Sequence, residues 1–378
     1  MKSCIVGIDA SRNRSGGAKH HLRGLLSAVD PVQFGISQVH VWAYQGLAKQ
    51  LPDAPWLVKH APAELEGSLW QQLWWQRRQL PHEVRRQGCD ILLSTDAGTI
   101  GTFEPSVVMS RDMLSYEPGE IDRYRFSGAW LRLLALRYVQ VRSLRRARGA
   151  IFLTKYAANT IQRFSGSLRN VAIIPHGVGE NFRLDAPESA PRFGDGPIRC
   201  LYVSNADLYK HQWHVIRAIG ELRKRGHDVV LTLAGASGQA QSLIDEAVAE
   251  VDSRGEFVES LGAVEHGQLP ALLGRANLFI FASSCENMPN TLLEGMASGL
   301  PIACSERGPM PEVLQDGGVY FDPEDARSIA AALEKLIVDA QLRTRVAGRA
   351  RELAEQFSWA RCARETWMFL HRNATDAD

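Results

Sequence analysis

The sequence predicts an α/β protein with two Rossmann-like domains, and three observations support this fold class. The chain has 378 residues, which is long enough for two domains that each bury a core. Short apolar runs alternate with longer amphipathic stretches, which is typical of a parallel sheet with crossover helices. Residues 185–197 are rich in proline and glycine and lack apolar periodicity, so we expect them to link the two domains.

The apolar runs predict strands in two series, one on each side of this linker. The first series is Cys4–Asp9, Val39–Tyr44, Asp90–Ser94, Val107–Ser110, Ala150–Thr154 and Val171–Ile174. The second series is Arg199–Ser204, Val229–Ala234, Glu256–Val258, Leu278–Ala282 and Pro301–Cys304. We therefore expect an N-terminal domain over residues 1–184 and a C-terminal domain over residues 198–357.

The final segment, residues 358–378, predicts one more helix, with Ser358 as its N-cap. This helix is rich in aromatic residues. We expect them to pack against other parts of the chain rather than to bind a ligand; they are Trp359, Trp367 and Phe369.

Composition and short motifs exclude several classes of function. The formal net charge is +1, so the chain as a whole is not attracted to nucleic acid. The six cysteines form no C-x-x-C pair, which favours reduced thiols over a disulfide framework or a zinc site. The apolar run Ile5–Ile8 is too short for a signal peptide, and no run is long enough to span a bilayer. These features predict a cytoplasmic protein.

The most informative motif contains two glutamates, Glu286 and Glu294, with seven residues between them. The run before it, residues 277–284, predicts a buried strand, and Thr291–Ser298 predicts a helix that a glycine and a proline end. A helix start offers unpaired N–H groups and the positive end of a dipole, which together suit a phosphate. One carboxylate beside this anion site and one behind it suit a nucleotide diphosphate sugar, because that molecule has hydroxyls on both sides of a diphosphate.

This motif resembles the Glu-x(7)-Glu signature of glycosyltransferase family 4, a family of retaining enzymes with the GT-B fold. The stretch from Glu286 to Ala303 follows the family pattern, with Gly295 in place of the usual alanine. The run from Cys304 to Glu312 is similar to the O-antigen and capsule branch of the family. The resemblance implies two Rossmann-like domains facing a central cleft, with the last helix returning to the N-terminal domain.

The resemblance also implies roles for individual residues. Glu286 would lie beside the transferred sugar, hold its hydroxyls and stabilise positive charge at the anomeric carbon. Glu294 would bind the ribose hydroxyls. The diphosphate would be held by Lys210, by the backbone at the helix start and by a glycine loop after the first strand; these further residues are Asn290, Thr291, Leu292, Gly16 and Gly17.

One departure from the family pattern concerns the charge on the donor side. Asn205 stands near the position where the family commonly has an arginine, whereas Lys210 matches the usual lysine. The chain therefore keeps one of the two usual cations. Either another cation compensates, with Lys19 and His211 as candidates, or the donor binds in a different geometry.

Two further departures concern the N-terminal half. Arg111 stands where many family members have a cleft histidine, so no general base is assigned there. Its side chain either contacts acceptor or donor oxygens or forms an ion pair with Asp112. His176 stands where the family has an asparagine near the hinge, and it either lines the cleft or belongs to a structural loop.

The sequence thus predicts a hexosyltransferase that uses a nucleotide diphosphate sugar and a glycan acceptor in cell-surface polysaccharide synthesis, such as that of lipopolysaccharide O-antigen. The O-antigen branch favours mannose or a deoxyhexose, and a GDP-linked donor over a UDP-linked one. No Asp-x-Asp motif and no cluster of acids or histidines at metal spacing is present, so we expect a metal-independent reaction. A GT-B sugar-nucleotide epimerase and a non-catalytic nucleotide-sugar-binding partner are the alternatives.

Two stretches of the N-terminal half combine aromatic residues with arginines. Arg123–Arg148 contains eight arginines and no acid, and its apolar residues gather on one helical face that includes Leu131 and Tyr138. Leu69–Arg78 is the second stretch. Either both are surface helices whose apolar faces pack inward, or they hold the protein on an anionic membrane surface, where a lipid-linked acceptor would lie.

Overall fold

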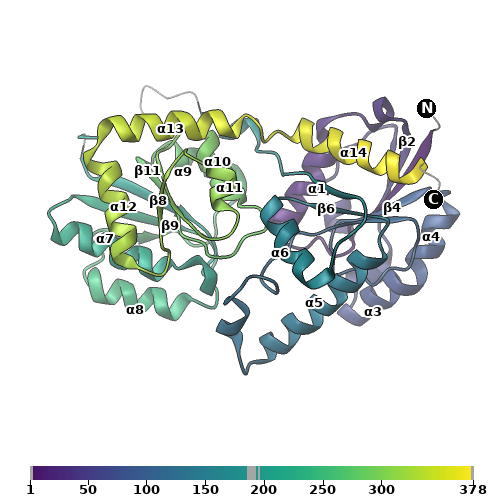
Figure 1. Cartoon of the computed structure of the whole chain (residues 1–378), viewed down its shortest axis with the longest axis horizontal. Helices are drawn as coiled ribbons and strands as arrows, with labels where there is room; N and C mark the ends of the chain where they lie inside the picture. Colours follow the sequence, from purple (N-terminus) through teal and green to yellow (C-terminus); the bar gives the residue numbers. More distant parts are fainter. Residues whose placement is uncertain (1–2, 185–192, 195, 376–378) are drawn as a thin grey trace. The chain divides into compact units, whose positions relative to one another are not determined.

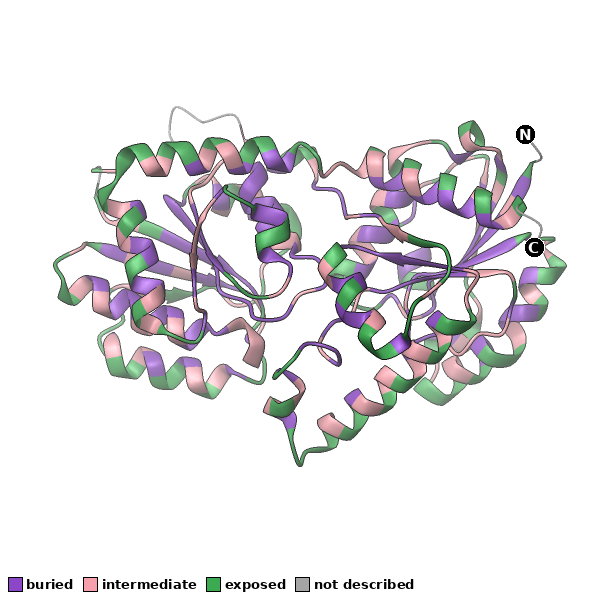
Figure 2. Cartoon of the chain, in the orientation of Figure 1, coloured by how far each residue is buried: buried purple, intermediate pink, exposed green. Residues whose placement is uncertain are grey.

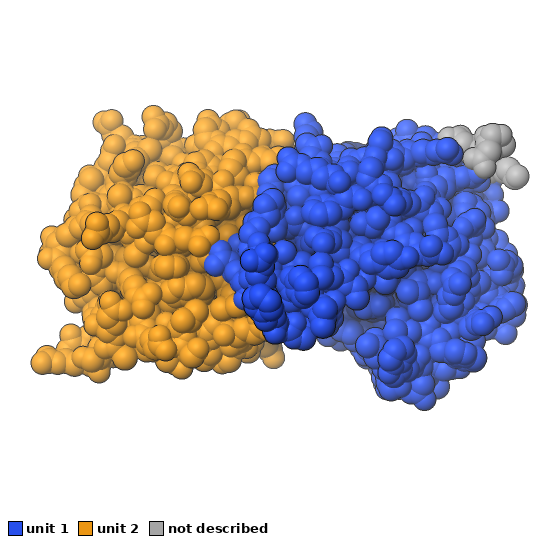
Figure 3. Space-filling view, turned by 60° about the horizontal axis from the view of Figure 1, so that its bottom comes forward, with its two compact units in different colours: residues 1–177, 358–378 blue, residues 178–357 orange. Residues whose placement is uncertain are grey.

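The computed structural model describes residues 3–184, 193–194 and 196–375, and it consists of two compact α/β units (Figures 1 and 3). The N-terminal unit comprises residues 1–177 together with residues 358–378. The C-terminal unit comprises residues 178–357. Each unit contains its own parallel sheet, which confirms the predicted class of two Rossmann-like domains.

The N-terminal unit is built on a seven-stranded sheet in the order β3-β2-β1-β4-β5-β6-β7, and all its paired strands are parallel. Its strands are β1 (Cys4–Asp9), β2 (Ile36–Trp42), β3 (Leu57–His60), β4 (Ile91–Ser94), β5 (Ser106–Met109), β6 (Gly149–Phe152) and β7 (Val171–Ile173). Its helices are α1 (Gly16–Ala28), α2 (Gln45–Ala48), α3 (Leu69–Trp74), α4 (Leu80–Arg86), α5 (Gly128–Arg146), α6 (Lys155–Ser165) and α14 (Trp359–Thr375).

The C-terminal unit is built on a six-stranded parallel sheet in the order β10-β9-β8-β11-β12-β13. Its strands are β8 (Ile198–Val203), β9 (Val229–Ala234), β10 (Val258–Ser260), β11 (Leu278–Phe281), β12 (Ile302–Ser305) and β13 (Val319–Phe321). Its helices are α7 (Gln212–Lys224), α8 (Gln241–Val251), α9 (Leu269–Leu273), α10 (Asn290–Ala297), α11 (Met310–Leu314), α12 (Ala326–Val338) and α13 (Ala340–Ala354).

The cores lie along the two sheets. Figure 2 shows that the central strands are buried and that the helices expose only their outer faces. All four residues of β11 are buried, as are all four of β4. These continuous apolar runs have the pattern of strands that are covered on both faces.

Strands β3 and β13, which both lie at the edge of a sheet, were not predicted from the sequence. Each is short, and each exposes part of most of its side chains. Short edge strands have little apolar patterning, because only one neighbouring strand and part of one face cover them.

The boundary between the units lies earlier than the sequence suggested. The chain leaves the N-terminal unit at Gly177 and not at residue 184, and the predicted linker falls largely on residues 185–192 and 195, which lie outside the described residues. Gly177 packs against the returning chain, since a Cβ there would lie 2.2 Å from the backbone nitrogen of Trp359. The next residue, Val178, donates its N–H to the carbonyl of Phe357 at 3.0 Å. The two chain crossings are therefore neighbours.

The C-terminal helix α14 packs into the N-terminal unit on glycine residues. A Cβ on Gly24 would meet the ring of Trp359 at 2.3 Å, and a Cβ on Gly149 would meet the ring of Phe369 at 2.9 Å. On its inner face α14 buries Cys362, Ala363, Thr366, Trp367, Phe369, Leu370 and Asn373. The aromatic residues of this helix that are buried serve packing, as the sequence indicated.

The basic helix α5 buries a different face from the expected one. Its buried residues are Leu133, Gln140 and Leu144, whereas Leu131 and Tyr138 remain 62% and 69% exposed. The residues just before it, Ile121–Tyr124, form a separate turn of 3₁₀ helix, so the predicted helix is also shorter than Arg123–Arg148. Among the described residues, no helix has the length and apolar content that crossing a bilayer requires.

Candidate functional site

The C-terminal sheet reverses its strand order between β8 and β11, which are neighbours in space although two strands separate them in the chain. In open α/β sheets, the crevice outside the carboxyl ends of two such strands is where ligands bind. The loop after β8 and the loop after β11 both begin at this edge. They carry the residues that the sequence marked as donor-binding and catalytic.

The motif with two glutamates forms the predicted strand, loop and helix. Strand β11 ends at Phe281, and α10 begins at Asn290, one residue before the predicted start. Glu286 lies in the loop between them, and Glu294 lies in the second turn of α10. Gly295 replaces the usual alanine because α10 packs closely on the sheet, where a Cβ would lie 2.7 Å from the ring of Phe279.

Glu286 forms an ion pair with Lys210, which connects the loop after β11 to the loop after β8. The two side chains are only 15% and 13% exposed. The ammonium group of Lys210 also lies 5.0 Å from the centre of the Tyr209 ring. The predicted catalytic carboxylate and the predicted phosphate-binding cation are therefore in direct contact.

Glu294 is almost completely buried, and its Oε1 lies 2.7 Å from Nε2 of His266. Burial raises the pKa of Glu294 above its usual value, and the interactions with His266 oppose that shift. His266 was not found from the sequence. It lies in a short 3₁₀ turn, His266–Gln268, that has no motif of its own.

A pocket of about 320 Å³ lies at the same edge of the sheet. Its lining residues come from the ends of β8 and β9, from the loop before α9 and from the start of α10; they are Val203, Ser204, Asn205, Asp207, Tyr209, Lys210, Ala234, Gly235, Ala236, Ala263, Val264, Leu269 and Thr291. Three predicted donor-binding residues are in this list, namely Asn205, Lys210 and Thr291. Asn290 and Leu292 are not, and the Leu292 side chain is fully buried in the core.

Backbone groups form much of the pocket wall. Gly235 approaches the loop after β8 so closely that a Cβ would lie 1.9 Å from the carbonyl oxygen of Ser204. The side-chain oxygen of Asn205 accepts a hydrogen bond from the N–H of Ala236 at 3.1 Å. Asn205 thus holds two loops together, which gives it a structural reason to be an asparagine.

The start of α10 offers backbone donors at the edge of the pocket. No side chain caps this helix, and Leu293 donates to the carbonyl of Pro289 at 3.1 Å. The N–H groups of Asn290, Thr291 and Leu292 precede this bond, and no described residue accepts from them. Three such donors at the positive end of a helix suit an anionic group.

Neither candidate for a compensating cation lines this pocket. His211 is fully buried at the start of α7, where its Nε2 lies 2.8 Å from Oγ of Ser284. Lys19 belongs to the N-terminal unit, and its ammonium group lies 6.0 Å from the centre of the Tyr44 ring. Lys210 is therefore the one lysine or arginine among the residues that line the pocket.

The predicted site residues of the N-terminal unit lie after strands β1, β5 and β7. Gly16 and Gly17 are exposed at the start of α1, which Ser15 caps by accepting from the N–H of Ala18. Arg111 follows β5 and donates from Nη2 to Oδ1 of Asn13 at 3.2 Å, so its bond partner is not Asp112.

His176 follows β7, and its ring packs edge-on against that of His21 with the centroids 4.4 Å apart. Burial, with the positive charges of Arg111 and His20, lowers the pKa of His176 to about 3. The imidazole is therefore neutral near neutral pH.

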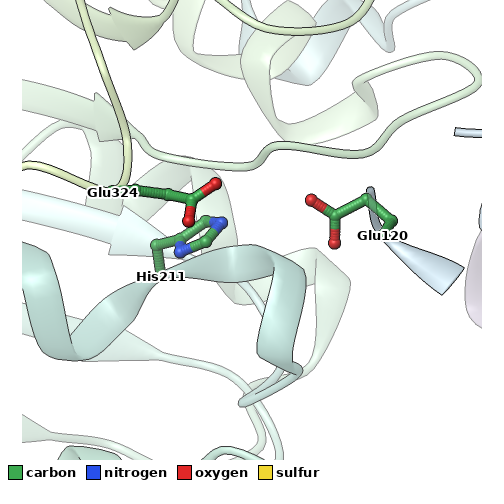
Figure 4. A group of neighbouring side chains, drawn as sticks. All are labelled: Glu120, His211 and Glu324. Atoms are coloured by element: carbon green, nitrogen blue, oxygen red, sulfur yellow. The ribbon is translucent and has the colours of Figure 1, made fainter. Parts of the chain in front are cut away.

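Figure 4 draws three side chains of the kinds that bind metal ions: His211 and Glu324 of the C-terminal unit, and Glu120 of the N-terminal unit. His211 comes from the start of α7 and Glu324 from the turn before α12, and a ligand atom of each lies within 4.8 Å of the other. Within either unit, no group of three such residues gathers in the part of the chain that the structure describes. Independence from metal stays a prediction.

Comparison with known proteins relates the C-terminal unit to sugar-transferring enzymes. Residues 188–353 match the family model described as glycosyl transferases group 1. O-antigen chain mannosyltransferase B of Escherichia coli is 32% identical over 136 residues, which cover 36% of this chain and 35% of that protein. The chain matches the first curated relatives over about a third to a half of their length, 35% and 49%.

Solved structures of similar fold cover almost the whole chain. Sucrose-phosphate synthase from Thermosynechococcus elongatus is 17% identical, with a TM-score of 0.76 over 98% of both chains. HepE of Anabaena, solved in complex with UDP, is 18% identical, with a TM-score of 0.72 over 97% of this chain and 98% of that one. At these identities the likeness establishes the GT-B fold.

Proposed function

We propose that this protein is a retaining hexosyltransferase of the family 4 type, which moves a hexose from a nucleotide diphosphate sugar to a hydroxyl of a glycan acceptor. The observation that carries the proposal is the contact between Lys210 and Glu286 at the edge of the 320 Å³ pocket. The match to glycosyl transferases group 1 over residues 188–353 supports it.

In the proposed reaction the bond between the anomeric carbon and the diphosphate oxygen breaks, and a bond from the acceptor oxygen forms on the same face of the sugar. The acceptor proton passes to the departing diphosphate, so no protein nucleophile is needed. Lys210 and the N–H groups at the start of α10 stabilise the negative charge on the leaving group. Glu286 stabilises the positive charge that develops at the anomeric carbon.

The positions of other residues in the two units suggest the remaining contacts with the donor. Glu294 is proposed to bind the ribose hydroxyls, with His266 holding its carboxylate in place at 2.7 Å. The start of α1 in the N-terminal unit, at Gly16 and Gly17, is proposed to approach the diphosphate through its backbone.

The proposal also concerns which sugar and which nucleotide the donor contains. The name of the Escherichia coli relative supports mannose, and the sequence resemblance favours GDP over UDP as the carrier. HepE was solved with UDP, so both bases need to be compared. Thermal unfolding in a panel of GDP- and UDP-sugars tests this, because a bound donor raises the midpoint of unfolding.

The acceptor is proposed to belong to a cell-surface polysaccharide and to lie at an anionic membrane surface. Helices α3 and α5 support this part, because they leave large apolar side chains exposed beside arginines. Trp70 is 80% exposed and Tyr138 is 69% exposed. Arginines with no bond partner among the described residues accompany them on the same helical stretches, namely Arg78, Arg132 and Arg142. Such a surface suits peripheral binding on the cytoplasmic face.

Release of nucleoside diphosphate, measured with and without a glycan acceptor, tests the reaction class. A transferase releases it only when an acceptor is present, and Glu286→Gln should slow the release by about two to three orders of magnitude. Conversion of the donor to an epimer without any acceptor would instead establish the epimerase. Donor binding without either reaction would establish a binding partner.

A further inference from the structure

Arg111 is a partly buried cation that forms no ion pair with a described residue, although the charge of Asp96 acts on it from a greater distance. It follows β5, and its Nη2 donates a hydrogen bond to the amide oxygen of Asn13. Its Nε is completely buried and has no hydrogen-bond partner. A guanidinium in this position is unfavourable unless an anion satisfies its donors. Burial accordingly lowers the pKa of Arg111 to about 10.

Three more buried polar atoms near Arg111 lack a partner: Nδ2 of Asn13, Oγ of Ser110 and Nδ1 of His176. Their side chains belong to residues that are 0%, 1% and 5% exposed. Most buried polar groups in proteins are hydrogen-bonded, so a cluster of unpaired ones indicates a missing partner. Asn13, Ser110 and His176 follow β1, β5 and β7, at the carboxyl edge of the N-terminal sheet where ligands of such sheets bind.

The hydrogen bonds of Asn13 fix the direction of its amide group. Oδ1 accepts from Nη2 of Arg111 and, at 2.9 Å, from Oγ1 of Thr95. Nδ2 is therefore left as a donor. A donor of this kind next to a buried guanidinium, with the Ser110 hydroxyl adjacent, suits a group of several oxygen atoms that only accept hydrogen bonds.

The acids of the neighbouring loops are engaged elsewhere. Asp96 pairs with Arg12 at 3.7 Å, and Asp9 accepts from Ser11 and Gln76. Asp112 accepts from Gln140 at 3.1 Å. None of these carboxylates bonds to Arg111, so its charge is available to a ligand.

We propose that Arg111, Asn13 and Ser110 bind an oxyanion carried by the acceptor, either a phosphate or a carboxylate. The assignment of this anion to the acceptor rests on the proposed transfer reaction. The anion site itself does not depend on that reaction. It predicts that the enzyme selects an acidic or phosphorylated glycan over a neutral one. His176, which is neutral, serves as a further hydrogen-bonding group and adds no second charge.

The first test measures thermal unfolding of the full chain with three probes: inorganic phosphate, glucuronate and glucose. Phosphate, glucuronate or both should raise the midpoint for the wild type, and glucose should not; which anion protects better identifies the oxyanion. Arg111→Met should weaken the protection at least tenfold in apparent affinity. The matched control is Arg163→Met, which removes an exposed arginine of α6 in the same unit and should leave the protection intact.

Two outcomes of this test overturn the proposal. One is that neither anion protects the wild type, or that Arg111→Met keeps the full effect. The other is that Lys210→Met loses the protection while Arg111→Met retains it, which would place the phosphate at the proposed donor pocket.

The unfolding midpoint of Arg111→Met without any ligand gives a second measurement, which distinguishes an anion-binding arginine from a purely structural one. If the site is built for a ligand anion, removing the charge of Arg111, which has no ion pair, should leave the unfolding midpoint equal or higher without any probe. A large drop in the midpoint of Arg111→Met, together with phosphate protection that this variant retains in full, would show that the arginine supports the fold only and would overturn the proposal.

A second test separates acceptor from donor. Binding of UDP and GDP by calorimetry should be unchanged in Arg111→Met, and a loss equal to that for phosphate would overturn the assignment to the acceptor. Where transfer is measurable, Arg111→Met should raise KM for acidic acceptors and leave neutral acceptors unaffected. If no nucleoside diphosphate is ever released, the proposed transferase fails while the phosphate result still stands.

Discussion

The ion pair of Lys210 and Glu286 predicts a measurable coupling between the two loops of the candidate donor site. We consider three variants: Lys210→Met, Glu286→Gln and the double variant. Each single change leaves one charged side chain of a mostly buried pair without its partner. The double change removes both charges, so it should be less destabilising than the sum of the single changes.

The expected loss of stability depends on how deeply the ion pair is buried. Exposed ion pairs contribute between 0 and about 1 kcal/mol, whereas breaking a fully buried pair costs about 3–5 kcal/mol. The side chains of Lys210 and Glu286 are 13% and 15% exposed, closer to the buried case but not dry. We expect each single change to cost about 2 kcal/mol, with a coupling energy of about 1–2 kcal/mol. In a unit of this size, 2 kcal/mol corresponds to a shift of about 4–8 °C in the unfolding midpoint.

The assay is thermal unfolding followed by calorimetry, which can resolve separate transitions when the two units unfold independently. The matched control is the exposed pair Arg217–Glu250, at 2.8 Å with side chains 35% and 58% exposed, for which the same cycle should give a coupling below about 0.5 kcal/mol. Additive single changes at Lys210 and Glu286 would refute the reasoning, because they would mean that the two charges do not stabilise each other.

Four further predictions concern catalysis, metal, packing and the membrane. Glu286→Gln should reduce turnover by about two to three orders of magnitude while the donor still binds, and near-normal turnover would remove this residue from the mechanism. Excess EDTA should leave activity intact, and a loss that magnesium or manganese restores would reveal a metal site. Gly295→Ala should lower the unfolding midpoint of the C-terminal unit, because the added methyl group needs space that the Phe279 ring occupies; overpacking costs about 1–3 kcal/mol, more than the gain of about 1 kcal/mol in helix propensity. The protein should float with anionic liposomes at low salt and not at high salt, since each arginine near the surface contributes about 1 kcal/mol. Replacing the exposed residues Arg78, Arg132 and Arg142 with glutamine should weaken flotation more than Arg163→Gln does. If the wild type does not bind the liposomes at low salt, this surface is not a membrane-binding surface.

The sequence predicted the central strands and the motif at Glu286 because these features are local. Strand β11 is a continuous apolar run, and the start of α10 follows from the residues that precede it. Two of the four edge strands, β3 and β13, were missed because a short strand that is covered on one side has no continuous apolar run. For α5, apolar periodicity indicated a face, but the packing of the unit buries the face of Leu133 and Leu144 instead.

The candidate site was predictable where one segment carries it and not where distant segments meet. His266 could not be inferred, because its contact with Glu294 joins residues that are 28 positions apart and belongs to no motif. The structural role of Asn205 depends on the backbone of Ala236, which only the fold brings near. The unpaired atoms around Arg111 likewise come from three separate loops.

Helix α14 has a consequence for the order in which the protein can fold during synthesis. Residues 178–357 leave the ribosome before the helix at 359–375 is made, so the C-terminal unit can fold while the N-terminal unit still lacks α14. Until then the surface that α14 covers, beside Gly24 and Gly149, stays open to water. The N-terminal unit, most of which is translated first, is therefore the last to complete its fold. A nascent chain stalled before α14 would expose that apolar surface to chaperones.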